Sequence, residues 1–400
     1  ALAPDRGPDS QMRPILIRNG RVLLDDTLED ADVLILDGII QPLGASVPAD
    51  ALQLDARNRL VLPGIVDVHG DAFERQIMPR PKVSFDLPLA LGETDRQLAA
   101  NGITTAYHGL TLSWEPGLRS IEAGSAFLEA LNRVRKNLSV DHRVQIRWET
   151  FAFEAIDLIC DWLERPLDLS IAFNDHTSST HRKITAGNHS KLSDWASRAG
   201  LSNEGYLAFF GQVWDRRAAV GDAVDRVATM TRASGVPMLS HDDLTLSDRA
   251  AFRSLGSDIA EFPLAEEIAS DARSHGEHCV FGAPNVVRGG SHTNAPTAAD
   301  MVTRGLGTVL ASDYYYPSLF SAAQRLIRDY SMPLAMAWAQ VSTNPAQAMR
   351  LADRGRIEPD LRGDIVIAQD LAQDGARIEA TLSEGTIAYL ANGALLECTQ

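Results

Sequence analysis

The stretch Leu60-Val61-Leu62-Pro63-Gly64-Ile65-Val66-Asp67-Val68-His69-Gly70-Asp71 decides how this chain folds. The part before His69 is almost wholly apolar, which is typical of a strand that is buried on both faces. Residues two apart in a strand point to the same side, so His69 and Asp71 can bind one cation together, and Gly70 leaves room for its approach. This pair alone supports a metal site and a packed histidine followed by a capping aspartate about equally.

Four further strand-like segments end in side chains of the same kinds. They are residues 144–149, which end at Glu149, residues 170–176, which end at His176, residues 236–241, which end at His241, and residues 307–313, which end at Asp313. Active sites of (β/α)8 barrels are built at the carboxyl ends of the strands. Because imidazole and carboxylate groups are suitable ligands for Zn, Mn, Fe or Ni, these strand ends together predict a metal centre.

The strand-like segments alternate with helical patterns, which predicts a TIM-type (β/α)8 barrel. Both ends of the chain carry short extended runs instead, with the hairpin signals Asn19-Gly20 and Asp37-Gly38 in the first of them. We therefore expect a small β-sandwich domain built from both termini, with residues 14–60 and 355–400 in the sandwich, 61–354 in the barrel and 1–13 disordered. The expected barrel strands are 61–68, 103–107, 144–149, 168–174, 236–240, 258–262, 278–283 and 307–312.

Composition limits the classes of partner. The 400 residues carry a net charge of −16, which disfavours binding to nucleic acid or to an anionic membrane but does not exclude a small anionic substrate. No apolar stretch approaches the ~20 residues of a membrane span, and residues 1–13 lack the apolar core of a secretory signal. The cysteines Cys160, Cys279 and Cys398 are far apart, which predicts a cytoplasmic protein without a thiolate zinc site.

Seven motifs give the chain a resemblance to the amidohydrolase superfamily. Within it, the chain resembles the PhnM branch, the α-D-ribose 1-methylphosphonate 5-triphosphate diphosphatases of phosphonate breakdown. The LPG and H-x-D elements mark only the superfamily, whereas the later motifs are more specific. The motifs are LPGIVDVHGD (62–71), MPRPKV (78–83), NGITTA (101–106), SHDD (240–243), IAEFP (259–263), GAPNVVRGGSH (282–292) and ASDYYYPSL (311–319).

The resemblance implies one or two divalent metal ions, with Zn as the first choice and Mn, Fe or Ni as alternatives. It implies that the metal ligands are His69, Asp71, Glu149, His176, His241 and Asp313. Glu149 takes the bridging position, and Asp313 is also the catalytic base for a metal-activated hydroxide. The implied reaction releases pyrophosphate and leaves ribose 1-methylphosphonate 5-phosphate. In the expected strand order His176 and His241 close the fourth and fifth strands, one strand earlier than is usual in the superfamily.

A phosphorylated substrate also needs cationic side chains. By the resemblance, these are Arg80, Arg288 and His292, and the residues themselves add Lys82 on the same loop as Arg80 and Gly289-Gly290 as an anion-binding turn. Without the resemblance, a solvated loop and an ordinary turn would explain the same residues. The roles of His108, His181, Asp242 and Asp243 stay open.

Two departures from the diphosphatase pattern leave the substrate less secure than the metal chemistry: His69-Gly70-Asp71-Ala72-Phe73, and Tyr107-His108-Gly109. The alternatives are therefore a metal-dependent amidohydrolase that cleaves a C–N bond in a small cyclic or acylated amide, and a non-catalytic barrel protein. Arginines around the metals would favour phosphate, and an apolar pocket would favour the amide. The sequence leaves the oligomeric state open, with a homodimer as the working expectation.

Overall fold

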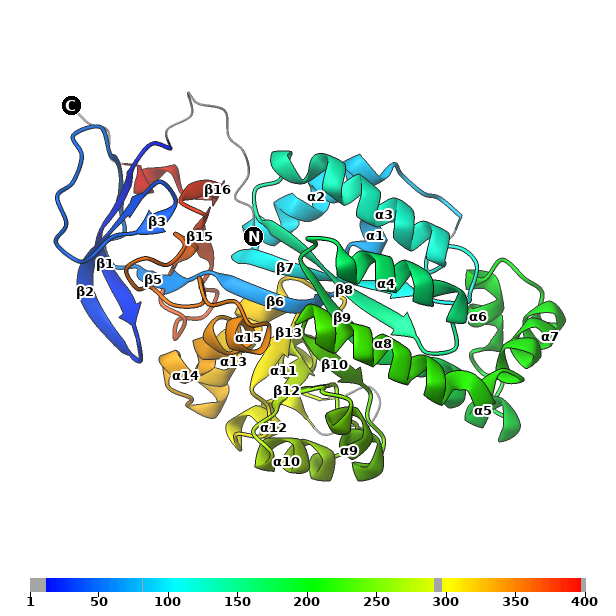
Figure 1. Ribbon diagram of the computed structural model, residues 1–400. Coiled ribbons are helices and arrows are strands. Elements are labelled where there is room, and N and C mark those ends of the chain that lie inside the picture. Colours follow the sequence, from blue (N-terminus) through cyan, green and yellow to red (C-terminus); the bar gives the residue numbers. More distant parts are fainter. Residues whose placement is uncertain (1–11, 81, 291–296, 397–400) are drawn as a thin grey trace.

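The computed structural model describes residues 12–80, 82–290 and 297–396, and the expected disordered segment 1–13 lies almost wholly outside them (Figure 1). Strands from both ends of the chain form one mostly antiparallel sheet, which confirms the predicted terminal β-unit. Its hydrogen-bonded order is β16-β15-β14-β5-β1-β2-β3, with β4 beside β1. The strands are β1 (Ile15–Leu24), β2 (Thr27–Leu36), β3 (Ile39–Ile40), β4 (Leu52–Asp55), β5 (Leu60–Pro63), β14 (Ile365–Ala368), β15 (Ile378–Ser383) and β16 (Thr386–Leu390).

One of the two expected hairpins is wrong. Asn19 and Gly20 lie inside the continuous strand β1, where the register with β2 shifts, and Asn19 has a φ of 61°. The Asn-Gly pair therefore supplies the left-handed residue of a β-bulge rather than a turn. The chain reverses instead after Leu24, which pairs with Thr27. Asp37-Gly38 does form a two-residue hairpin, with φ values of 47° and 83°.

The second sheet contains eight parallel strands in the order β13-β12-β11-β10-β9-β8-β7-β6, and all eight correspond to expected strands. Its first and last strands meet through a bridge between Gly70 and Asp313, which closes the sheet into a TIM-like barrel. Asp71 N donates to Asp313 O at 2.8 Å, and Asp313 N donates to His69 O at 2.9 Å. The strands are β6 (Ile65–Gly70), β7 (Ile103–Leu112), β8 (Asp141–Glu149), β9 (Leu169–Asn174), β10 (Met238–His241), β11 (Ile259–Glu261), β12 (His278–Gly282) and β13 (Val309–Ala311).

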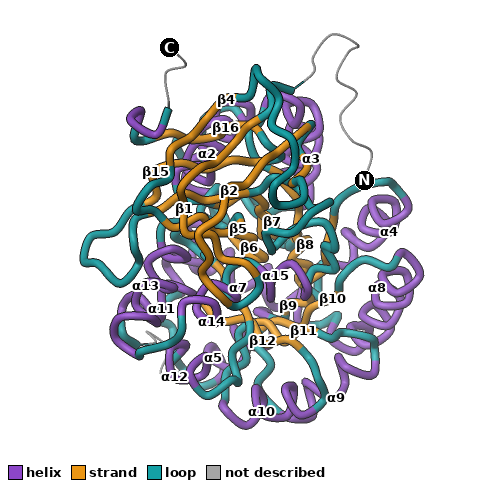
Figure 2. The backbone as a smooth tube through the Cα atoms, turned by 90° about the vertical axis from the view of Figure 1, so that its left-hand side faces the viewer, coloured by secondary structure: helices purple, strands orange, loops and turns teal. Residues whose placement is uncertain are grey.

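Helices follow the barrel strands and surround them (Figure 2). The helix Val220–Ser234 ends at Gly235, which has the left-handed conformation of a helix C-cap. Near the C-terminal end of the barrel, Leu334–Ala339 and Thr343–Ala348 form two short helices. The helices are α1 (Glu74–Ile77), α2 (Leu87–Ala100), α3 (Ile121–Val134), α4 (Ile156–Glu164), α8 (Val220–Ser234), α9 (Leu246–Ser254), α10 (Glu266–Ser274), α11 (Ala283–Arg288), α12 (Ala298–Thr303), α13 (Ser318–Tyr330), α14 (Leu334–Ala339) and α15 (Thr343–Ala348).

An insertion that the sequence did not predict follows β9. It comprises α5 (His176–Thr185), α6 (Leu192–Arg198) and α7 (Asn203–Trp214), which lie at the end of the barrel away from the terminal sheet (Figure 1). The insertion has a small core of its own, formed by Trp195, Tyr206 and Phe210 with their neighbours. Because it starts at the carboxyl end of β9, it stands beside the end of the barrel at which active sites are built.

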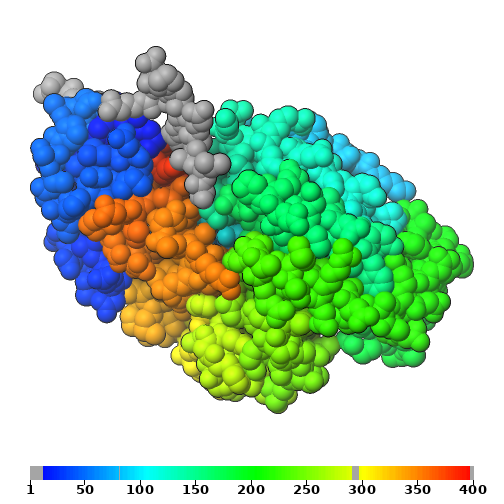
Figure 3. All heavy atoms as spheres, in the orientation of Figure 1, coloured from blue at the N-terminus to red at the C-terminus, as the bar shows by residue number. Residues whose placement is uncertain are grey.

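Gly64 is where the chain passes from one sheet to the other. Pro63 ends β5, and its carbonyl accepts a hydrogen bond from Trp338 Nε1 at 2.9 Å, while Ile65 begins β6. The crossing is four residues beyond the expected boundary at residue 60, because β5 pairs with β1 and β14. In Figure 3 the N-terminal and C-terminal segments form one lobe next to the barrel. Among the described residues, no helix is long and apolar enough to span a membrane.

Candidate metal centre

His69, Asp71 and Asp313 form the first candidate metal group. His69 and Asp71 come from the end of β6, and Asp313 follows β13 directly, so the bridge that closes the barrel also brings these side chains together. One coordinating atom from each residue lies within 4.8 Å of those of the other two. Asp313 holds this position with a φ of 55°, a strained conformation of the kind that gathers at functional sites.

His69, His241 and Glu261 form a second group, and all three are buried in the barrel. His69 Nδ1 lies 3.0 Å from Glu261 Oε1, which also accepts a hydrogen bond of 2.8 Å from Gln145 Nε2. The other oxygen, Oε2, lies 3.9 Å from His241 Nε2. In the described part of the chain neither that oxygen nor either ring nitrogen of His241 has a hydrogen-bond partner. Buried acceptors without a donor are costly, so this arrangement fits a bound cation.

A third group, His176, His241 and Asp242, lies further out. His176 is the first residue of α5 and its side chain is 49% exposed, whereas His241 is shared with the second group. His176 Nε2 lies 3.8 Å from Asp242 Oδ2. His69 and His241 each belong to two groups, so the three groups form one connected centre at the carboxyl ends of the strands.

The protonation states match the ligand forms that a metal requires. Burial lowers the pKa of His241 against the opposing charge of Asp242, so its imidazole is neutral at pH 7. Burial opposes the ionisation of Asp242 and Glu261, but the neighbouring histidines outweigh it. They hold the pKa of Asp242 at about 2 and that of Glu261 below its ordinary value. His69 is the exception: burial lowers its pKa, but the Glu261 and Asp313 carboxylates together outweigh burial and raise it, so this imidazole must lose its proton to bind a metal.

Two arginines approach the first group. Arg147 points from β8 into the barrel, where its NH1 lies 3.5 Å from Asp71 Oδ2. Arg119 NH2 lies 3.9 Å from the same oxygen and forms a two-pronged pair with Glu74, at 2.9 and 2.7 Å. The centre therefore contains fixed positive charge beside its carboxylates.

The comparisons with known proteins agree with this geometry. No protein-family profile matches the chain. It is 29% identical to α-D-ribose 1-methylphosphonate 5-triphosphate diphosphatase of Escherichia coli over 361 residues, which cover 88% of this chain and 95% of that protein. A solved amidohydrolase from an environmental sample of the Sargasso Sea matches with a TM-score of 0.66 at 15% identity, over 97% of this chain and 95% of that one. The chain thus resembles the diphosphatase over nearly its whole length and has the fold of the solved amidohydrolase.

Other known proteins are similar in fold or over short stretches. Phenylurea hydrolase B matches with a TM-score of 0.60 at 14% identity, over 94% of this chain and 96% of that chain. Rat dihydropyrimidinase is 46% identical over 61 residues, which are 14% of this chain and 12% of that protein. The names of these relatives are those of hydrolases, and the three candidate ligand groups of this chain are compatible with metal-dependent chemistry.

The eight strands confirm the expected positions of His176 and His241 in the barrel. No strand is missing and none is false: His176 follows the fourth strand, β9, and His241 ends the fifth, β10. Glu261 ends the sixth strand, β11, so the sixth strand contributes a carboxylate to the centre. The position was visible in the sequence, because Ile259-Ala260-Glu261 is another apolar segment that ends in an acidic residue.

Glu149, the expected bridging ligand, lies beside these groups without belonging to any of them. Its Oε1 accepts hydrogen bonds from Thr177 N at 3.0 Å and Thr177 Oγ1 at 2.7 Å. Its Oε2 lies 3.2 Å from both the backbone N and Nδ1 of His176. Glu149 thus fixes the start of α5, and with it the position of His176, while Glu261 is the carboxylate between His69 and His241.

Three of the expected anion-binding residues, Arg80, Lys82 and Arg288, lie in the part of the chain that the structure describes. Arg80 and Lys82 are exposed in the loop that follows α1, and Arg288 is exposed at the end of α11. Within the ranges that the structure describes, these three side chains form no ion pair. His292 lies outside the described residues. Arg147 is the basic residue that does reach the centre, and its polarity within a barrel strand was the signal that the sequence offered.

The residues whose roles were open have structural partners. His108 and His142 are buried on the outer side of β7 and β8, where His108 Nε2 lies 2.8 Å from His142 Nδ1 and His142 Nε2 lies 3.0 Å from Asp95 Oδ1. Asp243 accepts a hydrogen bond of 2.6 Å from Ser240 Oγ. The ring of His181 stacks on Trp214 with centroids 3.7 Å apart.

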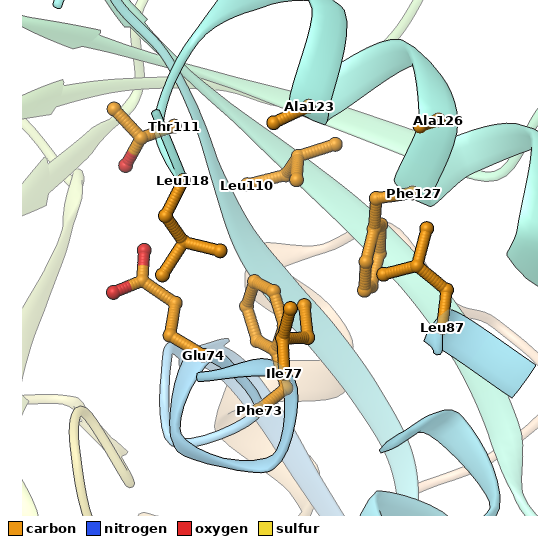
Figure 4. A pocket seen from close by; sticks show the side chains of 10 residues that line it. All are labelled: Phe73, Glu74, Ile77, Leu87, Leu110, Thr111, Leu118, Ala123, Ala126 and Phe127. Carbon is orange, nitrogen blue, oxygen red and sulfur yellow. The ribbon is translucent and has the colours of Figure 1, made fainter. Parts of the chain in front are cut away.

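A mostly apolar cavity of about 100 Å³ is lined by residues of α1, β7 and α3 and includes no candidate ligand. Phe73, Ile77 and Phe127 line one part, and the Glu74 carboxylate and the Thr111 hydroxyl lie together at the other end (Figure 4). Because Phe73 and Glu74 follow Asp71 closely in sequence, the cavity lies under the turn that leaves the metal-binding strand.

Proposed function

We propose that this protein hydrolyses α-D-ribose 1-methylphosphonate 5-triphosphate to the 5-phosphate and pyrophosphate. The observation that carries the proposal is the similarity to the Escherichia coli diphosphatase, which extends over 95% of that protein rather than over the metal motif alone. The expected zinc, the cytoplasmic location, the homodimer and the role in phosphonate metabolism stay predictions.

The chain's own residues suit a metal-dependent hydrolysis. His69, His241 and Glu261 would hold a divalent cation, and Asp71, Asp313, His176 and Asp242 offer the remaining ligands. When bound, the cation would supply Lewis-acid polarisation of the substrate and a water of lowered pKa. Burial and the nearby charge of Asp71 raise the pKa of Asp313, which makes this carboxylate a stronger proton acceptor. Asp313 would take the proton of the attacking water.

Fixed positive charge favours a phosphate substrate over a neutral amide. The chain as a whole is acidic, with a net charge of −16, yet Arg147 and Arg119 lie against the centre. The exposed Arg80, Lys82 and Arg288 lie on loops at the same end of the barrel. Guanidinium groups bind phosphoryl oxygens through paired hydrogen bonds.

Hydrolysis of a C–N bond in a small cyclic or acylated amide is the second candidate. The short but close match to rat dihydropyrimidinase favours it. The turn His69-Gly70-Asp71-Ala72-Phe73, which departs from the diphosphatase pattern, weakens the phosphate assignment in the same way.

Pyrophosphate release from ribose 1-methylphosphonate 5-triphosphate tests the proposal. Chelator-treated protein would be assayed with Zn, Mn, Fe or Ni restored, beside Asp313→Asn and the exposed control Asp374→Asn. We expect metal-dependent release that Asp313→Asn reduces at least ~100-fold and that Asp374→Asn retains. No release by metal-loaded wild-type protein, together with turnover of a cyclic amide, would replace the proposal by the second candidate.

A further inference from the structure

Arg147 is a buried arginine whose hydrogen-bonding capacity is mostly unused. It lies on the inner face of β8, between Gln145 and Glu149, and its side chain is only 8% exposed. Its Nε has no partner among the described residues, and its one hydrogen bond there is the long contact of 3.5 Å to Asp71. A guanidinium has five N–H donors, and a buried donor that makes no hydrogen bond costs free energy.

A buried arginine with a structural role looks different in the same protein. Arg354 NH1 donates to Asp141 Oδ2 and to Thr105 Oγ1, both at 2.7 Å. Its Nε and NH2 donate to Asp353 at 2.8 and 3.0 Å. Packing the fold together therefore accounts for Arg354, but it leaves the free donors of Arg147 unexplained.

Arg147 stands among the candidate metal ligands. Its charge helps to lower the pKa of Asp242, partly offsets the raised pKa of Asp313, and works against protonation of His69 and His241. Gly109 on β7 makes this position possible. A Cβ at residue 109 would lie 3.1 Å from Arg147 Cδ and 3.4 Å from His69 Nε2, so the arginine stem and the imidazole share the space that the glycine leaves.

We propose that Arg147 is a substrate-binding residue that donates hydrogen bonds to phosphoryl oxygens of a di- or triphosphate at the metal centre. A buried guanidinium beside bound metal would favour a phosphoryl anion, because both offer positive charge to its oxygens and the guanidinium also offers N–H donors in a planar array. The proposal rests on the proposed function for the ribosyl substrate, but its ligand class follows from the unpaired guanidinium.

Pyrophosphate binding to the metal-loaded protein, measured by isothermal titration calorimetry, tests this role. We compare wild-type protein with Arg147→Gln, Arg147→Lys and the control Arg165→Gln, an exposed arginine at the end of α4. Removing a charged hydrogen-bond donor should weaken binding roughly 10- to 100-fold in Arg147→Gln. Arg147→Lys should lie between this variant and wild type, Arg165→Gln should bind like wild type, and all four proteins should hold equal amounts of metal.

Two results would overturn the inference. Unchanged pyrophosphate affinity in Arg147→Gln would mean that the guanidinium does not meet the anion. Parallel loss of metal in both Arg147 variants would make Arg147 a counter-ion that keeps Asp71 in place. If the wild-type protein fails to release pyrophosphate from the ribosyl triphosphate while its pyrophosphate binding still depends on Arg147, the substrate assignment fails and this inference stands.

Discussion

Glu149 and Glu261 each end a barrel strand, but they differ in how many of their carboxylate oxygens have a hydrogen-bond donor. Glu149 has hydrogen-bond donors for both of its oxygens, supplied by the first two residues of α5. Glu261 keeps one oxygen free and directed towards His241. The sequence predicts that both glutamates stand at strand ends, but it does not show that N–H and O–H groups of α5 bind the Glu149 carboxylate in place of a metal.

Replacing Glu149 by Gln should lower stability without removing the metal. The amide nitrogen of Gln would face the backbone N–H of His176, so one buried donor loses its acceptor at a cost of about 1–3 kcal/mol. The free energy of unfolding in urea and the metal content report the two effects separately. Glu204→Gln, at an exposed site in α7, is the control. Loss of metal in Glu149→Gln at unchanged stability would instead make Glu149 a ligand.

His108 should make stability depend on pH. Its burial, and then the nearby His142 and Arg135, lower the pKa of His108 well below its ordinary value of 6.5. The unfolded chain therefore binds a proton near pH 6.5 that the folded protein does not bind. The free energy of unfolding should fall as the pH drops below that value, by up to about 1.4 kcal/mol per pH unit.

Comparing wild-type protein with His108→Gln isolates this effect, because Gln cannot titrate but can still hydrogen-bond to His142. Urea unfolding between pH 7 and 5 should give a shallower pH dependence in the variant. Equal slopes for the two proteins would show that His108 does not contribute.

At the scale of elements, the junction between the two sheets leaves no space at Gly64. A Cβ at residue 64 would lie 2.2 Å from Thr104 Oγ1 and 2.7 Å from its Cγ2, and Thr104 is fully buried. Gly64→Ala should therefore destabilise the protein by about 1–3 kcal/mol. Thermal unfolding would measure this, with Gly92→Ala, which meets nothing within 4 Å, as the control.

The added substitution Thr104→Ala should restore part of the stability of Gly64→Ala, because it removes the two nearest atoms. If the loss of stability in the double variant equals the sum of the losses in the two single variants, the steric explanation of the junction is wrong.

The regular elements of the barrel could be predicted from sequence because each strand is an apolar run with its own boundary signal. The insertion α5–α7 could not, since its core of Trp195, Tyr206 and Phe210 is small and its helices are short. The Asn19-Gly20 turn was misplaced because a left-handed residue serves a bulge as well as a hairpin. Periodicity indicates which element forms, but not what packs against it.

At the scale of the whole molecule, an ion network at the amino-terminal ends of the strands joins the end of the barrel to its second and third strands. Arg354 follows α15 and binds Thr105 of β7 and Asp141 of β8. Burial opposes the ionisation of Asp141, but Arg143 and Arg354 outweigh it and lower its pKa. The network thus secures the end of the barrel opposite the metal groups.

Arg354→Met should cost about 3–5 kcal/mol, because it leaves buried carboxylate charge with fewer partners. Chemical unfolding measures the loss, with the half-exposed Arg325→Met as the control. A loss no larger than that of the control would mean that Arg143 alone suffices for Asp141.

The number of strands and the clustering of His69, Asp71, His241 and Asp313 could be predicted before the structure, since strand ends of a closed barrel must converge. Whether Glu261 and Arg147 belong to the metal centre depends on which inward-facing side chains lie at the same height in the barrel as His69 and His241. The sequence shows Glu261 at a strand end and Arg147 within a strand, but whether they reach the centre follows only from how the strands are paired.

The metal content of Glu261→Gln tests the central claim most directly. Wild-type protein, Glu261→Gln and the exposed control Glu204→Gln would be dialysed against one zinc concentration and analysed by mass spectrometry of the metal. The account predicts at least one ion per chain in wild-type protein and in the control, and less than about a tenth of that in folded Glu261→Gln. Full metal content in Glu261→Gln would contradict a centre built on His69, His241 and Glu261.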